Sequence, residues 1–167
     1  INQLLREGYK VFITGSNASM LSVELGTHLT GRHLSIELFP FSYSEFTRFK
    51  ELNNGEVAVT DYLIAGGIPE YVKNGIPAVL NTLVDDILMR DIAVRHSIRD
   101  IVSLRQLTAF LITNIGNLVS ANKLVGMFDI KSPATFLEYF SFLKDGYLLE
   151  FMPMFSHSLK VQALNPK

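Results

Sequence analysis

The chain has 167 residues, with 15 Lys and Arg against 16 Asp and Glu, which gives a formal net charge of −1. Its length allows one domain or two small ones, and 48% apolar residues exclude a largely disordered chain. The balanced charge gives no strong field for nucleic acid or an anionic membrane. There is no Cys, which excludes disulfides, thiolate metal sites and a cysteine nucleophile, and with only 4 His we expect no metal site.

The two ends of the sequence look cut. The chain opens at Ile1 without a Met or a signal peptide, and residues 1–5 read as the tail of a helix already under way. The last residues stop just after a strand-like run. We therefore expect a fragment of a longer protein. Because no stretch approaches 18 uninterrupted apolar residues, we also expect no membrane span and a cytoplasmic location.

The first 41 residues predict a strand, a helix and a second strand. Residues 9–14 form an apolar run without alternation, typical of a strand buried on both faces. Ser16 or Asn17 is placed to cap the helix that follows, and Gly31 ends it. Residues 34–39 alternate between apolar and polar and predict the second strand. This segment has the length of a βαβ unit.

Residues 42–100 read as helical throughout. Ser42 and Glu45 have the spacing of a capping box at the start of one helix. Residues 57–64 predict the next helix, and the sequence from Gly66 to Pro69 predicts a sharp bend. Pro77 begins a further helix, whose apolar stripe is Val79, Leu80, Leu83, Val84, Ile87 and Leu88.

Residues 101–167 predict three helices and a β-hairpin, which is the winged-helix arrangement. The first helix spans roughly 103–115, Ser120 caps a short second one, and Ser132 with Pro133 opens the third. The hairpin strands are expected at 147–152 and 158–164. The fold class is therefore mainly α with a truncated α/β piece, divided into residues 1–41, 42–100 and 101–167.

Several segments together resemble one family. These are 11–17, 29–32, 38–46, the Gly66-Gly67-Ile68-Pro69-Glu70 run and Arg90-Asp91-Ile92. Together they resemble the second half of the core in a group of prokaryotic AAA+-type P-loop ATPases, which commonly carry a further, often nuclease-like, C-terminal domain. The resemblance implies the end of the ATPase core at 1–41, a helical lid at 42–100 and a winged helix at 101–167.

The resemblance also implies roles for five residues. Thr14 and Gly15 would border the nucleotide in the sensor-1 region, and Ser16 or Asn17 would orient the attacking water or sense the γ-phosphate. Arg32 would be an arginine finger or a phosphate-facing arginine, since such a side chain neutralises charge on the transferring phosphoryl oxygens. Whether Arg32 would act in cis or in trans stays open.

One departure from the family pattern limits what this chain does alone. It contains no G-x-x-x-x-G-K-[ST], so the phosphate cradle is missing, as is the acidic pair expected before sensor 1. We expect ATP and Mg²⁺ to bind the parent protein and not this fragment. A degenerate ATPase that serves only as a structural or protein-interaction domain is a further alternative.

The winged helix leaves two interpretations open. In one it binds DNA through phosphate contacts from Lys123, Lys131, Thr135, Lys144 and Lys160. In the other it packs against the ATPase core, a neighbouring subunit or another protein. The second is favoured, because residues 100–167 carry six Lys and Arg against five Asp and Glu, and Glu138 lies on the predicted reading face.

Two smaller sets of residues have structural interpretations. Asp91 and Arg95 have the spacing of a helical ion pair, so the arginines around them predict a salt-bridged surface. His96 is expected at the surface or in packing. The aromatic residues between Phe39 and Phe49 are expected in a core and not in a base-stacking platform.

Overall fold

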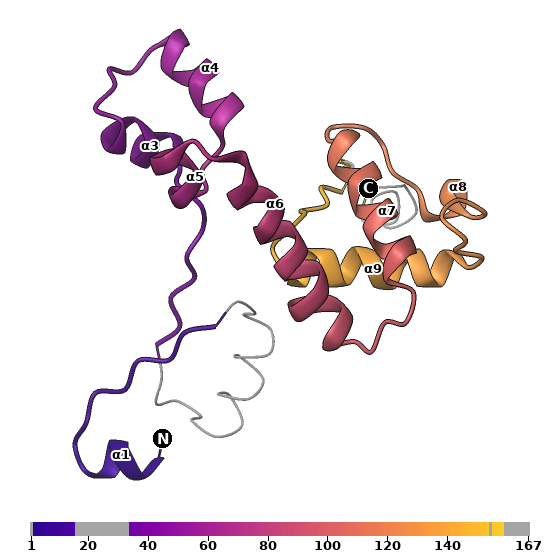
Figure 1. Cartoon of the computed structure of the whole chain (residues 1–167), viewed down its shortest axis with the longest axis horizontal. Helices are drawn as coiled ribbons and strands as arrows, with labels where there is room; N and C mark the ends of the chain where they lie inside the picture. The colour runs from indigo at the N-terminus through magenta and orange to yellow at the C-terminus, as the bar shows by residue number, and fades with distance from the viewer. Residues whose placement is uncertain (1, 16–33, 154, 159–167) are drawn as a thin grey trace. The chain divides into compact units, whose positions relative to one another are not determined.

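The computed structural model describes residues 2–15, 34–153 and 155–158 (Figure 1). Throughout these residues the regular structure is helical and no strand is formed. The chain divides into two compact units, His33–Asp85 and Ile1–Arg32 with Asp86–Lys167. The predicted mainly helical fold is therefore confirmed for the described part of the chain.

The smaller unit is built from short helices. They are α3 (Tyr43–Phe49), α4 (Glu56–Ala65), α5 (Pro69–Asn74) and α6 (Pro77–Asp86), of which the last crosses into the second unit. The predicted capping box at the start of α3 is confirmed. The Glu45 amide donates to Ser42 Oγ at 3.4 Å, and the Ser42 amide donates to Glu45 Oε2 at 2.8 Å. The amide of Ser42 holds the pKa of Glu45 below its usual value, because it stabilises the carboxylate.

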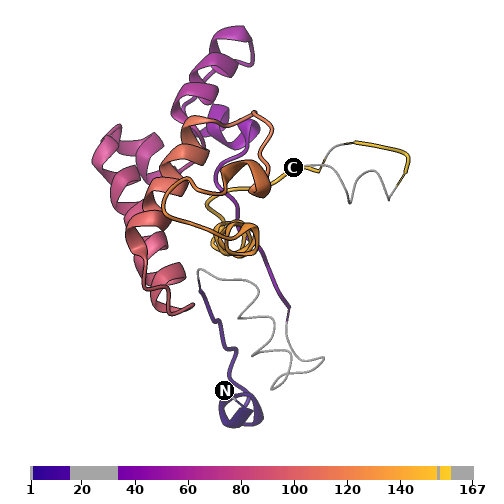
Figure 2. The same ribbon diagram turned by 90° about the vertical axis from the view of Figure 1, so that its right-hand side faces the viewer.

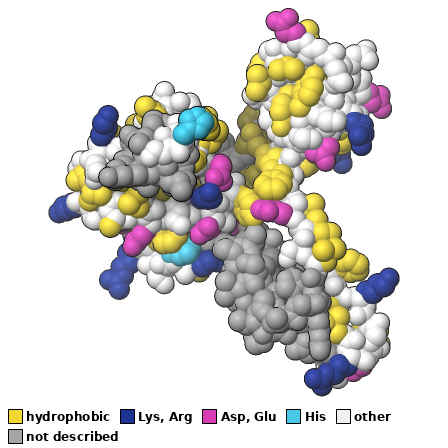
Figure 3. All heavy atoms as spheres, turned by 180° about the vertical axis from the view of Figure 1, so that it is seen from behind, with side chains coloured by type: hydrophobic (Ala, Val, Ile, Leu, Met, Phe, Trp, Pro, Cys, Tyr) yellow, Lys and Arg dark blue, Asp and Glu magenta, His cyan; other side chains and the backbone are white. Residues whose placement is uncertain are grey.

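Aromatic rings join α3 to α4. Phe46 is buried, and its ring centroid lies 5.3 Å from that of Tyr62, as expected for a core aromatic. Phe39 and Phe49 are exposed, so the prediction that the whole aromatic run is core holds only in part. Hydrophobic side chains also gather on the outer surface of this unit, at the upper right of Figure 3.

The predicted bend after α4 has a specific packing reason. The Phe41 amide donates to the Gly67 carbonyl at 2.7 Å, and Tyr62 Oη donates to the Phe41 carbonyl at 2.8 Å. A Cβ on Gly67 would lie 2.3 Å from the Phe41 carbonyl oxygen, closer than any real contact. Only glycine therefore allows the chain before α3 to approach the end of α4 this closely.

The larger unit has its core between four helical elements. The chain stays helical through Asp86 into the π-helix η1 (Ile87–Val94), which is followed by α7 (Ile101–Thr113), α8 (Ala121–Leu124) and α9 (Pro133–Asp145). The described part of this unit also includes α1 (Asn2–Arg6). Helix α9 packs against α8 and η1, and α7 packs against η1. The buried apolar side chains are Leu88, Ile92, Ala93, Leu104, Leu107, Leu111, Leu124, Ile130, Phe136, Tyr139 and Leu143.

Local signals set the ends of these helices. The Ser103 amide donates to the Asp100 carboxylate at 3.0 Å at the start of α7. Ser132 accepts from the Ala134 amide at 3.2 Å, with Pro133 in the first turn of α9, which confirms the predicted start of that helix. Figure 2 looks almost along the axis of α9.

The strands expected at 9–14 and 34–39 are not formed. Both segments lack regular structure, and Phe12 is 89% exposed where a buried strand was predicted. Residues 16–33, between the two segments, lie outside the described part of the chain. An apolar run becomes a strand only when another backbone pairs with it, and the described residues contain no such ladder.

The hairpin expected after α9 is also absent from the described residues. The amides of Leu148 and Leu149 both donate to the Leu143 carbonyl, at 3.0 and 3.3 Å, so they complete the end of α9 instead of a ladder. The Phe151 ring packs on Phe140, with centroids 4.8 Å apart. The second predicted strand, 158–164, lies outside the described residues except for Ser158.

A ring stack joins η1 to α9. His96 follows η1, and its ring lies 3.6 Å from that of Phe142, with an angle of 14° between the planes. This confirms the predicted packing role of His96. Burial lowers the pKa of His96, the neighbouring Arg95 lowers it further, and Asp145 acts in the opposite direction.

We expect Gly67→Ala to destabilise the smaller unit by about 1–3 kcal/mol, because the added methyl forces the Phe41 backbone away. Hydrogen exchange measured on peptides from residues 41–67 should show the loss of protection. Gly55→Ala is the matched control, since nothing lies within 4 Å of its Cβ position and its φ of 171° suits any residue. Wild-type protection in Gly67→Ala would contradict the packing argument.

We expect the stack on Phe142 to make stability depend on pH. The folded-state pKa of His96 lies below the ordinary value of 6.5, so the unfolded chain takes up the proton first. The stabilisation of the fold by neutral His96 is therefore complete above pH 6.5, and it is lost as the pH falls below that value. Urea unfolding at pH 7.5 and 5.5 should show a smaller loss for His96→Phe than for wild type. His157→Gln, a change at an exposed histidine, should behave like wild type, and equal losses in all three proteins would refute the role of His96.

Candidate functional site

The residues expected to sense the nucleotide fall mostly outside the described structure. Ser16, Asn17 and Arg32 all lie in the segment 16–33, so their roles stay predictions. Thr14 and Gly15 are described, and both are exposed in irregular chain at the end of the apolar run that begins at Tyr9. Of the five residues, the structure therefore places only Thr14 and Gly15, and both are accessible.

The candidate phosphate-contacting residues differ from one another in exposure and in charge pairing. Lys123 and Lys131 are exposed and Thr135 is half-buried. Lys144 Nζ instead lies 2.6 Å from Glu150 Oε1, so its charge is paired. Lys160 lies outside the described residues. A DNA phosphate would have to compete with Glu150 for Lys144.

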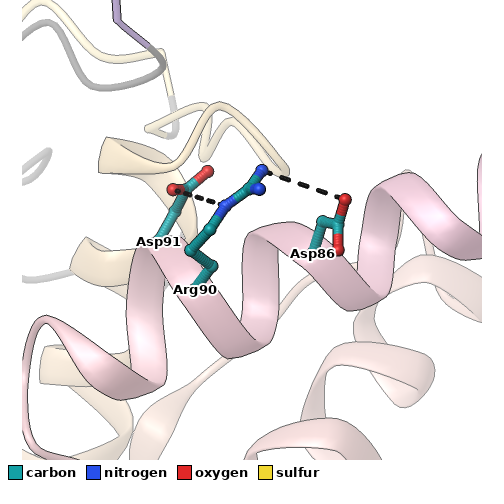
Figure 4. A network of polar contacts seen from close by, with 3 residues as sticks. All are labelled: Asp86, Arg90 and Asp91. Carbon is teal, nitrogen blue, oxygen red and sulfur yellow. Dashed lines mark ion pairs between the residues drawn. The ribbon is translucent and has the colours of Figure 1, made fainter.

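The clearest polar network in the described residues surrounds Arg90, at the junction of α6 and η1 (Figure 4). Its guanidinium lies between two carboxylates, with Nη2 3.8 Å from Asp86 Oδ2 and Nε 3.9 Å from Asp91 Oδ1. Asp86 is exposed, whereas only 10% of the Asp91 side chain is exposed. Arg90 thus supplies the counter-charge that a nearly buried carboxylate needs.

The ion pairs that form around η1 differ from the pair that the spacing of Asp91 and Arg95 predicts. The expected pair of Asp91 with Arg95 is replaced by the pair of Asp91 with Arg90. The general prediction of a salt-bridged face is confirmed. Asp86 precedes Arg90 by four residues, which is the favourable order for an ion pair on a helix. This spacing is a sequence signal for the pair that forms.

This network suits a structural role more than anion binding. Two carboxylates surround one guanidinium, so the local charge is negative and repels phosphate. Arg95 differs, because its Nη1 atom is buried without a hydrogen-bond partner in the structure. Arg99 is exposed. The arginines that the sequence groups together therefore have three different environments.

In the part of the chain that the structure describes, no three His, Asp or Glu side chains lie close enough to hold a metal ion. Among the helices of the described chain, none is long and apolar enough to cross a membrane.

The curated relatives of this chain are longer proteins. An uncharacterized protein of Methanocaldococcus jannaschii is 32% identical over 182 residues, which cover 96% of this chain and 41% of that protein. An uncharacterized protein of Haemophilus influenzae is 32% identical over 149 residues, which cover 83% of this chain and 37% of that protein. The chain thus spans about two fifths of the length of these relatives. No solved structure is significantly similar to it.

Two family models match successive parts of the chain. Residues 1–47 match an AAA domain, which supports the AAA-like origin that the resemblance implied. Residues 57–167, more than half of the chain, match a domain of unknown function. By that match, the chain belongs to the family of the domain of unknown function DUF8612.

Proposed function

We propose that this chain is part of an ATP-hydrolysing AAA-like protein, in which it transmits the state of the nucleotide to helical units. The match of residues 1–47 to an AAA domain carries the proposal. The order of the two matches supports it as well, since the AAA segment directly precedes the helices that would respond.

In this proposal the nucleotide end of the chain is a sensor. Thr14 and Gly15 border the bound nucleotide, Ser16 or Asn17 contacts the γ-phosphate or the attacking water, and Arg32 offsets phosphoryl charge. The described residues do not form a cradle for ATP and Mg²⁺. The sequence contains no G-x-x-x-x-G-K-[ST], so the cradle has to come from another part of the longer protein.

The helical units would be the responding part. Residues 42–100 would act as a lid and residues 101–167 as a winged helix. The succession of α7, the short α8 and α9, with α8 packed on α9, is consistent with the helical half of that fold. A winged helix packed on the ATPase core would carry the lid movement to a partner protein.

DNA binding by α9 has less support. Glu138 is exposed on that helix, and Lys144 is already paired with Glu150. Titration of duplex DNA at several salt concentrations tests this alternative. A steep salt dependence that weakens in both Lys123→Ala and Lys131→Ala would favour it over a protein partner.

We expect the parent protein, extended upstream of Ile1, to hydrolyse ATP, and the 167-residue chain not to do so. In the extended protein, Arg32→Ala should lower kcat by about 10³-fold, because the charge on the transferring phosphoryl group loses its counter-charge. Steady-state ATPase assays give the rates. Arg99→Ala, at an exposed arginine that the proposal does not use, should leave kcat unchanged.

Binding and folding measurements separate the possible failures. Circular dichroism should show that Arg32→Ala is folded, and mixing it with wild type tests for action in trans. An extended protein that neither binds nor hydrolyses ATP would overturn the proposal and favour a degenerate ATPase with a structural role. Full activity in Arg32→Ala would remove Arg32 from the mechanism and leave the ATPase assignment standing.

A further inference from the structure

Helix α4 is more apolar than its surroundings explain. Its sequence from Glu56 to Ala65 places apolar residues on every face, a pattern typical of a helix that is covered all round. Yet only Ala58 of this helix is fully buried. The side chain of Ile64 is 79% exposed and that of Leu63 is 77% exposed. Large apolar side chains exposed together on one short helix mark an interaction surface.

One face of α4 borders a groove. Asp61 precedes Ile64 by three residues and Ala65 by four, so these three residues lie on the same side of the helix. A groove of about 370 Å³ lies next to them, between α4 and the end of α3. Its lining residues are Phe46, Lys50, Leu52, Asp61, Ile64 and Ala65, and we call this surface the α4 groove.

The α4 groove carries one charge of each sign. Its apolar lining carries one cation, Lys50, from the segment after α3, and one anion, Asp61, from α4. Both side chains are exposed, and no ion pair joins them to another described residue. In a second copy turned by 180°, each of these two charges has one of opposite sign to pair with, while the apolar lining residues meet their equivalents.

We propose that the α4 groove is the interface of a homodimer with twofold symmetry. Ile64 of each copy enters the groove of the other, and Lys50 of each copy pairs with Asp61 of the other. In such an isologous interface every contact occurs twice. Burial of the apolar centre supplies most of the affinity, and the two charge pairs fix the orientation.

Two charge reversals test this arrangement with the full 167-residue chain. Lys50→Glu places carboxylates opposite one another at both ends of the interface, and Asp61→Lys does the same with amines. Each variant alone should dimerise at least tenfold more weakly than wild type in analytical ultracentrifugation. The double variant, with both changes in one chain, should dimerise like wild type.

Mixing the two single variants gives the sharper test. One copy then carries two carboxylates on the rim and the other carries two amines, so both pairs form between unlike copies. With one variant labelled with ¹⁵N, native mass spectrometry should detect the mixed dimer well above the 1:2:1 ratio that random pairing gives. A contact within one chain cannot give this rescue in trans.

Two exposed residues of α4, Ile64 and Leu63, provide a test and a matched control for the apolar part of the interface. Ile64→Ser should weaken the dimer at least tenfold, because Ile64 lines the groove. Leu63→Ser removes an equally exposed side chain that is not part of the groove lining, and should leave dimerisation unchanged. Since both positions are exposed, both variants should fold, which circular dichroism checks.

Three results would overturn the proposal. The first is a wild-type chain that stays monomeric up to about 100 μM, two orders of magnitude above a micromolar dissociation constant. The second is a mixture of the charge variants whose mixed dimer does not exceed the 1:2:1 ratio of random pairing, and the third is equal weakening by Ile64→Ser and Leu63→Ser. A monomer would leave the α4 groove to a different protein, and failed mixing would indicate another contact between copies.

Discussion

The larger unit depends on the burial of one face of α9. Phe136 and Leu143 are completely buried two turns apart, and α8 and η1 both pack against this helix. Removing two such side chains from water contributes about 3–6 kcal/mol, a large part of the net stability of a small domain. The stack of His96 on Phe142 extends the same contact, so a titratable group is built into the joint between η1 and α9.

The smaller unit depends on a close backbone approach rather than on a large core. Its buried apolar residues are Phe46, Ala58 and Val72, and the Phe41–Gly67 contact closes the unit at the end of α4. So small a core leaves most of α4 uncovered. The exposed apolar surface of α4 and the thin core are thus two aspects of one fact, which is why we assign a second copy of the chain to the α4 groove.

The functional proposal and the dimer proposal involve different parts of the chain. The first concerns the AAA-like residues 1–47, of which 16–33 lie outside the described structure. The second concerns contacts within the smaller unit. The Arg90 network is compatible with both, because it stabilises the junction of α6 and η1 and leaves little positive charge for a phosphate. Each proposal can therefore fail without the other.

The sequence by itself determined where most helices begin. Ser42 with Glu45, and Ser132 with Pro133, set helix starts through bonds to residues two or three positions away. Such bonds are local, so spacing alone predicts them. The AAA-like origin of residues 1–47 was also readable, because it follows from a run of motifs.

Only the tertiary structure decided the remaining features. The segments 9–14 and 34–39 have strand-like sequences but no strand, because pairing depends on a backbone distant in the sequence. Asp91 pairs with Arg90 and not with Arg95 as its spacing predicts, and its burial beside Leu88 and Ile92 comes from the packing of η1 in the unit. The exposure of Ile64 likewise depends on what covers α4 and not on its own sequence. Local hydrogen bonds are encoded within a few residues, whereas pairing, register and burial are properties of the whole fold.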